Sequence, residues 1–244
     1  MRNNFLNFRV GEDSRNIYRV MSYERFLQML AERKNALVLP AKWDDPFENF
    51  ILNGTIRTGD GKVGSIGFRD SLYGQCWSLH VETDAMWRMY SPFVDKRGVK
   101  LKTTIPTLFN SLYAHAGEFR DVSCFIGKVQ YLTKAKIKDA LEKVNILDST
   151  GIGIAQTLLI KRYAFRPERE VRLIYFNQNA NAPNGVFSYP IDPNALIREV
   201  VLDPRLLRED AETLKAEIKV AGFRNRVIQS GLYRPPENII LNIP

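Results

Sequence analysis

The strand-like segments of this chain are short, and helix-like segments interrupt them at irregular intervals. The clearest strand is Glu170–Phe176, in which Val171, Leu173 and Tyr175 alternate with their neighbours. A doubly wound parallel sheet needs strands and helices in regular alternation, which this order lacks. We therefore predict an α+β fold, a single domain with a mixed, mostly antiparallel sheet and flanking helices.

The remaining elements are expected from hydrophobic periodicity, capping residues and turn residues. Strands are expected at residues 16–20, 36–39, 75–79, 98–103, 125–132, 186–191, 199–202, 227–228 and 239–241. Helices are expected at residues 23–34, 84–90, 106–115, 133–145, 150–161 and 203–221, and a loop at 54–67. We expect residues 1–15 to form a flexible N-terminal arm and residues 16–244 to form one globular domain.

Composition excludes several classes of protein. The chain has 244 residues, of which 45% are hydrophobic, and this is enough to bury one substantial core. It contains no run of about 18 apolar residues, so no membrane span is expected. The start of the chain lacks the apolar segment of a signal peptide, and two cysteines, Cys76 and Cys124, cannot form a disulfide framework. We therefore expect a cytoplasmic protein.

The formal net charge of +8 favours an acidic partner such as a nucleotide or nucleic acid. The basic residues are scattered, however, and several lie on segments that look like solvated helices. No long stripe of aromatic residues alternates with the charges, as a single-strand binder would need. A solvated basic surface is therefore the simpler interpretation.

The familiar catalytic and ligand-binding motifs are absent. The sequence has no phosphate-binding loop with a glycine-lysine ending and no dinucleotide-binding glycine turn. The two histidines, His80 and His115, and the two cysteines do not have the spacing of metal ligands. We therefore expect no metal.

Four segments carry unusual polar and aromatic residues. They are Tyr18–Ser22, Trp43–Glu48 with its Asp-Asp-Pro-Phe-Glu core, Cys76–Ser78 followed by Asp84–Ser91, and Arg166–Leu173 with its Glu-Arg-Glu. In this order the segments resemble a bacterial domain-of-unknown-function family, number 2971, over roughly residues 17–233. That family's name implies no activity. We expect the four segments to form one surface.

A second resemblance does imply an activity. The order Arg19, Ser78 and then Glu168-Arg169-Glu170 resembles the Arg–Ser–Glu signature of ADP-ribosyltransferases. The resemblance implies that Arg19 contacts the phosphates of NAD and that Ser78 supports the nicotinamide ribose. It also implies that Glu170 assists the departure of nicotinamide while Glu168 polarises the acceptor. We expect Arg19, Ser78 and Glu170 to line one cleft.

Further residues are candidates for the same site. Tyr18 adjoins Arg19, and Trp77, Trp87 and Tyr90 offer rings that can stack on nicotinamide, although packing in the core is an alternative for each of them. Acidic side chains of the Trp43–Glu48 loop either form a wall of the site or pair with Arg19. The candidate loop residues are Asp44, Asp45, Phe47 and Glu48.

Three functions are carried forward. The first is an ADP-ribosyltransferase-like enzyme that uses NAD as a co-substrate and transfers to a protein or nucleic-acid acceptor, plausible in a toxin or a phage-defence effector. The second is a non-catalytic nucleotide- or nucleic-acid-binding module. The third is a metal-dependent nuclease that uses Asp44, Asp45, Glu48 and Glu170 around a divalent ion.

Overall fold

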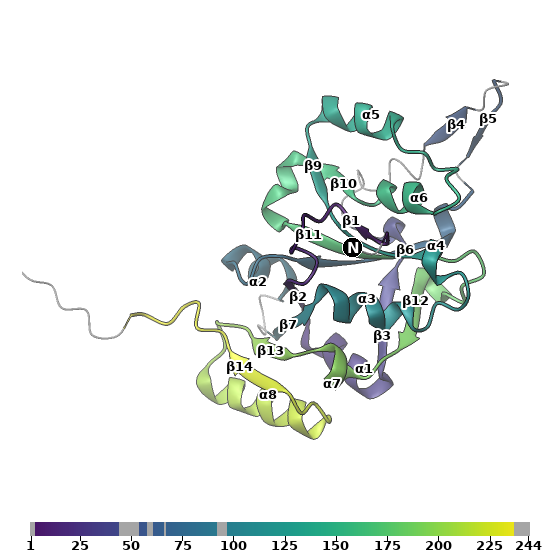
Figure 1. Ribbon diagram of the computed structural model, residues 1–244. Coiled ribbons are helices and arrows are strands. Elements are labelled where there is room, and N and C mark those ends of the chain that lie inside the picture. The colour runs from purple at the N-terminus through teal and green to yellow at the C-terminus, as the bar shows by residue number, and fades with distance from the viewer. Residues whose placement is uncertain (1–2, 44–53, 58–60, 66, 92–96, 237–244) are drawn as a thin grey trace, which may run out of the picture.

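A ten-stranded sheet forms the centre of the molecule in the computed structural model, which describes residues 3–43, 54–57, 61–65, 67–91 and 97–236 (Figure 1). Its main path runs β1-β8-β11-β6-β2-β7-β13-β14, and β3 and β12 branch from β6. The strands are β1 (Phe5–Leu6), β2 (Asn16–Ser22), β3 (Lys34–Val38), β6 (Leu72–Ser78), β7 (Gly98–Thr104), β8 (Cys124–Lys128), β11 (Glu170–Phe176), β12 (Val186–Pro190), β13 (Glu199–Leu202) and β14 (Arg226–Gln229). Within this sheet only β1–β8 and β13–β14 pair in parallel. The predicted α+β fold with a mixed, mostly antiparallel sheet is confirmed.

The helices begin largely where the sequence predicts. They are α1 (Tyr23–Glu32), α2 (Asp84–Tyr90), α3 (Ile105–Tyr113), α4 (Arg120–Ser123), α5 (Lys134–Glu142), α6 (Ile152–Thr157), α7 (Pro193–Leu196) and α8 (Arg208–Val220). Ser22 and Thr83 cap α1 and α2, because each hydroxyl accepts a backbone N–H of the first turn. Short 3-10 segments complete the described chain: η1 (Pro40–Lys42), η3 (Arg69–Ser71), η4 (Tyr163–Glu168) and η5 (Pro183–Gly185).

The sheet divides along β6. One end of β6 pairs with β2, where Ser78 lies opposite Tyr18, and the other end pairs with β3, where Gly74 lies opposite Val38. Since α1 joins β2 directly to β3, these two strands diverge from each other along β6. The division leaves the middle of β6 with one regular neighbour, β11.

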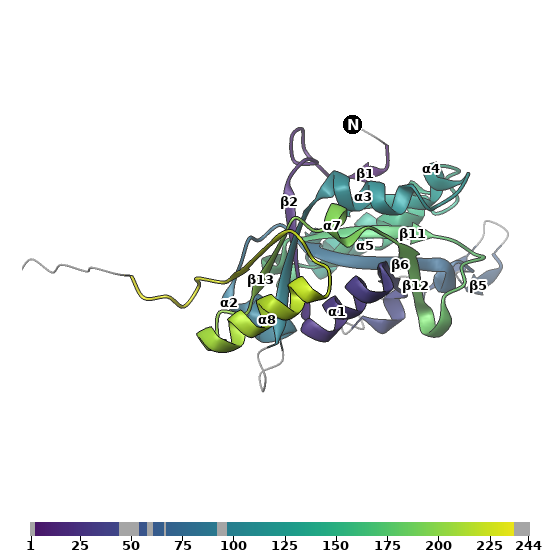
Figure 2. The same ribbon diagram turned by 90° about the horizontal axis from the view of Figure 1, so that it is seen from below.

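Alternation along the strands sorts the side chains into two layers. The larger core packs Ile17, Leu101, Leu173 and Val200 against residues of α1, α3 and α8. Figure 2 shows α1 and α8 side by side, and Phe26 of α1 meets Phe223, which follows α8, edge to face at 5.7 Å between ring centroids. The opposite side of the sheet carries two smaller clusters, one beside α6 and one beneath α2.

The prediction that residues 1–15 form a flexible N-terminal arm is wrong. Residues 5 and 6 form β1, which pairs with β8, and Leu6 is buried. The buried Asn4 amide donates to the carbonyls of Asp121 and Cys124, each at 2.8 Å. Two apolar residues flanked by hydrogen-bonding asparagines are too short a pattern to register as a strand.

Other expected elements also differ. The single strand predicted at residues 125–132 is two strands, β8 and β9 (Gln130–Leu132). The helix predicted at 150–161 ends early, and its last residues form β10 (Ile160–Arg162), which pairs with β9. The predicted loop at 54–67 contains a hairpin of β4 (Thr55–Arg57) and β5 (Val63–Ser65), and the helix predicted from residue 203 begins at Arg208. The strand expected at 239–241 lies outside the described residues.

No helix within the described part of the chain is both long enough and apolar enough to cross a membrane.

Candidate active site

Two carboxylates and two cations form a buried cluster at the start of β11. Lys161 Nζ lies 2.6 Å from Glu170 Oε1 and 2.6 Å from Glu168 Oε2. Arg172 Nε donates to the other oxygen of Glu170, Oε2, at 2.7 Å. Lys161, Glu170 and Arg172 are all buried, whereas the Glu168 side chain keeps 21% of its surface exposed. Glu168 is therefore the carboxylate that solvent reaches.

The backbone at Arg169 explains how both carboxylates reach Lys161. Glu168 ends η4 rather than lying on the strand, and Arg169 has a left-handed conformation with φ of 45°. The chain turns there before Glu170 begins β11. Glu168 and Glu170 therefore do not project from one strand face, although their side chains converge on Lys161.

Lys161 reaches the cluster because β10 is a strand. β9 and β10 pair in parallel beside the sheet, and Gln130 N–H donates to the carbonyl of Leu159 at 2.8 Å. Arg172 Nη1 donates to the neighbouring carbonyl of Leu158, also at 2.8 Å. Lys161 was not among the predicted site residues, because the sequence pattern places it at the end of the helix expected at residues 150–161.

Ser78 lies in register with both Glu170 and Tyr18 on neighbouring strands, so the three residues share one side of the sheet. Its hydroxyl donates to the carbonyl of Glu168 at 2.7 Å and accepts the backbone N–H of His80 at 3.0 Å. Ser78 thus holds the backbone of Glu168 against the end of β6. Its predicted role at the nicotinamide ribose stays a prediction.

Arg19 does not share that side of the sheet. It follows Tyr18 by one residue, and alternation directs it toward Ile17 and Met21, whose side chains belong to the larger core. Its backbone direction alone does not bring the guanidinium to Ser78 and Glu170, so the expectation that Arg19, Ser78 and Glu170 line one cleft stays a prediction. Burial lowers the pKa of Arg19, while Cys76 and Tyr90 raise it, so the guanidinium lies near the division between β2 and β3.

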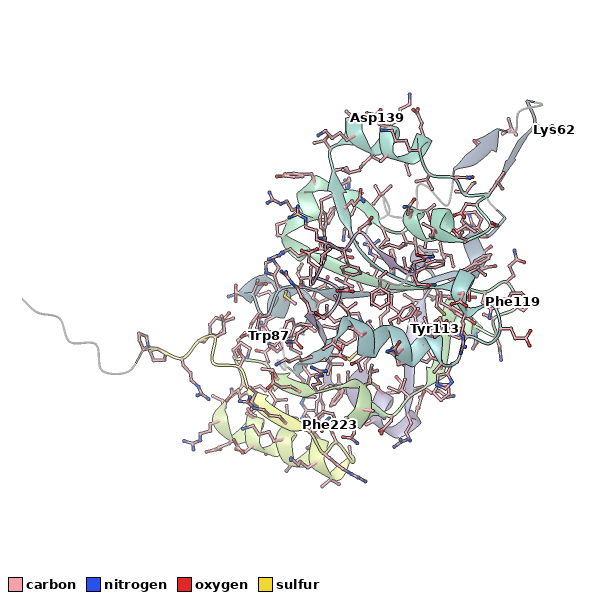
Figure 3. The ribbon with its side chains drawn as sticks, in the orientation of Figure 1. Lys62, Trp87, Tyr113, Phe119, Asp139 and Phe223 are labelled. Atoms are coloured by element: carbon pink, nitrogen blue, oxygen red, sulfur yellow. The ribbon has the colours of Figure 1, made fainter. Side chains whose placement is uncertain are left out.

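The aromatic candidates separate clearly. Trp77 and Trp87, the latter labelled in Figure 3, are buried, and their indole N–H groups donate to Gln75 and Glu82 at 2.8 Å. Neither presents a ring face to a bound nicotinamide, so their predicted stacking role is corrected to packing. Tyr18 is also buried. Tyr90 alone remains 49% exposed.

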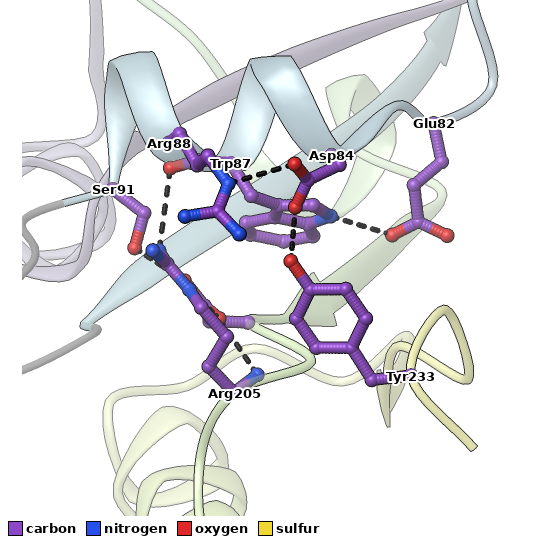
Figure 4. Close-up of polar contacts among 8 residues, drawn as sticks. Glu82, Asp84, Trp87, Arg88, Ser91, Arg205 and Tyr233 are labelled. Carbon is purple, nitrogen blue, oxygen red and sulfur yellow. Dashed lines mark hydrogen bonds and ion pairs between the residues drawn. The ribbon is translucent and has the colours of Figure 1, made fainter. Parts of the chain in front are cut away.

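The helix α2, which ends at Tyr90, is fastened at several points (Figure 4). Asp84 accepts from the Tyr233 hydroxyl and from Arg88 Nε. At the other end of the helix, Arg205 Nη2 donates to the carbonyl of Trp87 at 3.3 Å. These contacts fix α2, and with it Tyr90, against β2 and the C-terminal segment.

Neighbouring charges separate the pKa values of the two carboxyls. Burial alone raises the pKa of Glu170, but Arg172, Glu168 and Lys161 together hold it well below its ordinary value. Burial and the adjacent Glu170 raise the pKa of Glu168 to about 7. Burial, with Glu168 and Glu170 nearby, raises the pKa of Tyr90 to about 12. At neutral pH Glu170 is ionised and Glu168 is close to its titration midpoint.

The predicted Trp43–Glu48 loop is only partly within the described residues. Trp43 packs its ring on the Arg172 guanidinium, 4.4 Å from the ring centroid, and also against Gly74, where a Cβ would lie 2.6 Å from the ring. Asp44, Asp45, Phe47 and Glu48 lie outside the described residues. Their predicted roles stay predictions.

A pocket of about 610 Å³ lies beside η4. Its lining residues are His80, Tyr163, Ala164, Arg166, Pro167 and Arg169. Burial and Arg169 lower the pKa of His80, although a hydrogen bond with the Pro167 backbone raises it. His80 is therefore neutral at pH 7, and the pocket's charge comes from its two arginines.

No group of three or more His, Cys, Asp and Glu side chains able to hold a metal occurs among the residues that the structure describes. The nuclease hypothesis depends on Asp44, Asp45 and Glu48, which are not among them.

Comparisons with known proteins found a few similar solved structures. No protein-family model matches the chain, and no curated protein matches it. Structures of Thermus sp. 2.9 DarT in complex with carba-NAD+ and with NAD+ are 11% and 12% identical, with TM-scores of 0.39 and 0.41, over 89% of this chain and 96% of theirs. The same protein in complex with ADP-ribosylated ssDNA is 12% identical over 94% of this chain and 98% of that one, with a TM-score of 0.41.

At these identities and TM-scores, the likeness assigns neither a family nor a ligand to the chain. The resemblance to family 2971 stays a prediction. What the structure itself defines is an α+β protein whose buried glutamate–lysine–arginine cluster opens to solvent through Glu168, next to a basic pocket.

Proposed function

We propose that the protein is an ADP-ribosyltransferase-like enzyme that cleaves NAD beside the cluster of Glu168, Glu170 and Lys161. The observation that carries this proposal is the pairing of a fixed, ionised carboxylate with an exposed one whose pKa lies near neutrality. Pairs of carboxyls with separated pKa values are typical of sites that break bonds to a sugar carbon. In this proposal Glu168, rather than Glu170, faces the substrate, and it takes the role predicted for Glu170 in addition to its own.

The proposed reaction breaks the bond between ribose C1′ and the nicotinamide nitrogen. The bonding electrons leave with nicotinamide, and positive charge develops on the ribose. An ionised carboxylate nearby stabilises that charge, because it acts where the dielectric is low. The acceptor then attacks C1′, and Glu168 takes the proton that the acceptor loses.

The other residues have supporting roles in this proposal. Lys161 orients Glu168 through the 2.6 Å contact, and Arg172 keeps Glu170 ionised and in place. Ser78 fixes the backbone of Glu168. Tyr90 offers the exposed ring for nicotinamide. Arg19, whose charge is acted on by Cys76 and Tyr90, keeps the contact with the NAD phosphates that the resemblance implies.

Labelled NAD tests the proposal. Purified protein is incubated with NAD labelled in its adenylate part, together with bacterial lysate, single-stranded DNA or RNA, and both nicotinamide release and label transfer are measured. We expect Glu168→Gln to lower the release rate by about 10²- to 10³-fold, because it removes the carboxylate that stabilises the positive charge on the ribose. Glu142→Gln, on the exposed face of α5, is the matched control and should react as the wild type does. Absence of release and transfer by the wild type, or equal rates for Glu168→Gln, would refute the proposal.

A second candidate function is a non-catalytic nucleotide- or nucleic-acid-binding module. The observation that favours it is the burial of Glu170 between two cations, because structural ion-pair networks also shift pKa values. Binding of NAD or nucleic acid without any nicotinamide release would decide for it. Growth arrest of cells that express the wild type but not Glu168→Gln would support a role as a toxin or phage-defence effector.

A further inference from the structure

The surface of η4 combines exposed cations with exposed rings. Arg166 Nη1 donates to the Tyr163 hydroxyl at 2.8 Å, and its guanidinium lies 5.6 Å from the centroid of that ring. One turn inward, Lys161 and Arg162 both lie over the ring of Phe165, at 4.5 and 5.0 Å. Aromatic and basic side chains therefore contact one another along residues 161–166, a stretch too short to form a visible pattern in the sequence.

The pocket beside η4 presents one sign of charge. Arg166 and Arg169 are exposed at its wall, Tyr163 is 51% exposed, and none of the lining residues is acidic. A planar guanidinium suits a phosphate, and a ring with an exposed face suits a nucleobase. The volume of about 610 Å³ is in the range of small-ligand sites and accepts one nucleotide unit.

We propose that this pocket binds single-stranded nucleic acid, with a base stacked on Tyr163 and the neighbouring phosphate held by Arg169 and Arg166. The neutral His80 at the wall supplies a hydrogen-bonding edge rather than another charge. A paired strand presents no free base face, so a duplex lacks the stacking contact. The net charge of +8 assists the approach of a polyanion.

The position of the pocket gives the bound strand a role as the acceptor, and this role rests on the proposed function. Glu168 is the last residue of η4, and its carbonyl is joined through the Ser78 hydroxyl to the backbone of His80. One wall of the pocket is thus fastened to the backbone of the reacting carboxylate. A nucleotide held there lies next to the sugar that the acceptor must attack.

Fluorescence anisotropy with a labelled single-stranded DNA of about 12 nucleotides tests the binding site. The same strand as RNA, its duplex and an acidic peptide are run beside it at several salt concentrations. Arg169→Gln should weaken binding and reduce the slope of log Kd against log salt by about one. Tyr163→Leu should weaken binding about tenfold with the slope unchanged, and Tyr163→Phe should bind as the wild type does, because it keeps the ring.

Lys138→Gln is the control for charge, since Lys138 is 82% exposed on α5, and it should change Kd less than twofold. The proposal is overturned if the wild type does not bind the strand, if Arg169→Gln and Tyr163→Leu bind as Lys138→Gln does, or if the duplex or the acidic peptide binds better. Nicotinamide release without acceptor separates the two proposals. A wild type that binds the strand without releasing nicotinamide contradicts the proposed function alone, and one that releases nicotinamide without binding the strand contradicts the binding site alone.

Discussion

Glu168 and Glu170 are two residues apart and contact the same lysine, yet their pKa values are shifted in opposite directions. Glu170 has both carboxylate oxygens bound to cations, Oε1 to Lys161 and Oε2 to Arg172. Among the described residues, Glu168 is paired with one cation, Lys161, and it lies beside the negative charge of Glu170. The difference in the number of cations, rather than in burial, therefore decides which carboxyl titrates near neutral pH.

This arrangement predicts an unusual dependence of stability on pH. The folded protein keeps the proton on Glu168 up to a pKa of about 7, whereas the unfolded chain releases it near 4.5. The free energy of unfolding should therefore fall as pH rises from about 4.5 to 7 on account of this group. Glu170, whose folded pKa is lowered, contributes stability above pH 4.5 that is lost as pH falls further.

Urea unfolding of the wild type and Glu168→Gln at several pH values between 4.5 and 7.5 measures the effect. We expect the stability of Glu168→Gln relative to the wild type to increase steadily with pH across this window. His80 acts in the opposite direction, because its folded pKa is lowered, but both proteins share it and the comparison removes it. A difference that does not change with pH would contradict the raised pKa of Glu168.

Arg172 should be among the most sensitive positions for stability. Arg172→Met removes the cation at Glu170 Oε2 and the donor to the Leu158 carbonyl, and leaves Glu170 buried with one partner fewer. Such a loss costs about 3–5 kcal/mol of unfolding free energy. The double variant Arg172→Met with Glu170→Gln should lose less than the sum of the two single variants, because no unpaired carboxylate remains. Additive losses in urea unfolding would show that the pair is not coupled.

At the scale of elements, patterns that extend over a whole strand or helix could be predicted from sequence. β11 was predicted to the residue, and α1 and α2 begin after their predicted caps. Elements of two or three residues could not be predicted, because they form only where a neighbouring strand supplies their hydrogen bonds. β1 and β10 are of this kind, and each pairs with a strand distant in sequence.

The candidate site combines residues at the ends of long strands with a residue on a short strand, so only part of it could be predicted from the sequence. Glu168, Glu170 and Ser78 could be recognised by order along the chain, since Ser78 ends β6, Glu170 begins β11 and Glu168 precedes that strand by two residues. Lys161 could not be recognised, because it lies on β10. Arg19 leaves β2 on the opposite side from Tyr18, since one step along a strand moves a side chain to the other face of a sheet.

The docking of β1 predicts that Asn4 matters for stability. Asn4→Ala removes both hydrogen bonds of the buried amide and leaves two buried carbonyls without this donor, which costs about 1–3 kcal/mol of unfolding free energy. Val10→Ala is the control, because Val10 is 95% exposed, and it should be neutral. Chemical denaturation compares the two variants. Equal stability of Asn4→Ala and Val10→Ala would mean that the first residues do not contribute to the sheet in solution.

At the scale of the whole molecule, one core joins the two parts of the sheet that meet at β6. One part contains β8 and β11, and the other contains β2 and β7. Ile17 of β2 and Leu101 of β7 belong to the same cluster as Leu173 of β11, although β6 lies between β2 and β11 in the sheet. The smaller clusters lie on the opposite side, one with Leu158 and Ile174 and the other with Val20 and Trp87. The halves should therefore unfold together, because neither can expose its side of the larger core alone.

The three tryptophans provide a direct test of this cooperativity, because each lies in a different cluster. Trp77 belongs to the larger core, Trp43 packs on the cluster with Leu158, and Trp87 lies in the cluster beneath α2. In variants that retain one tryptophan, with phenylalanine at the other two positions, the fluorescence transition and the far-ultraviolet circular dichroism transition should coincide in urea. The two transitions are compared within each variant, so the stability lost through the substitutions does not affect the comparison. An earlier fluorescence transition in the variant that retains Trp87 would show that α2 and the strands beneath it form a separate cooperative unit, with the carboxylate cluster on its boundary.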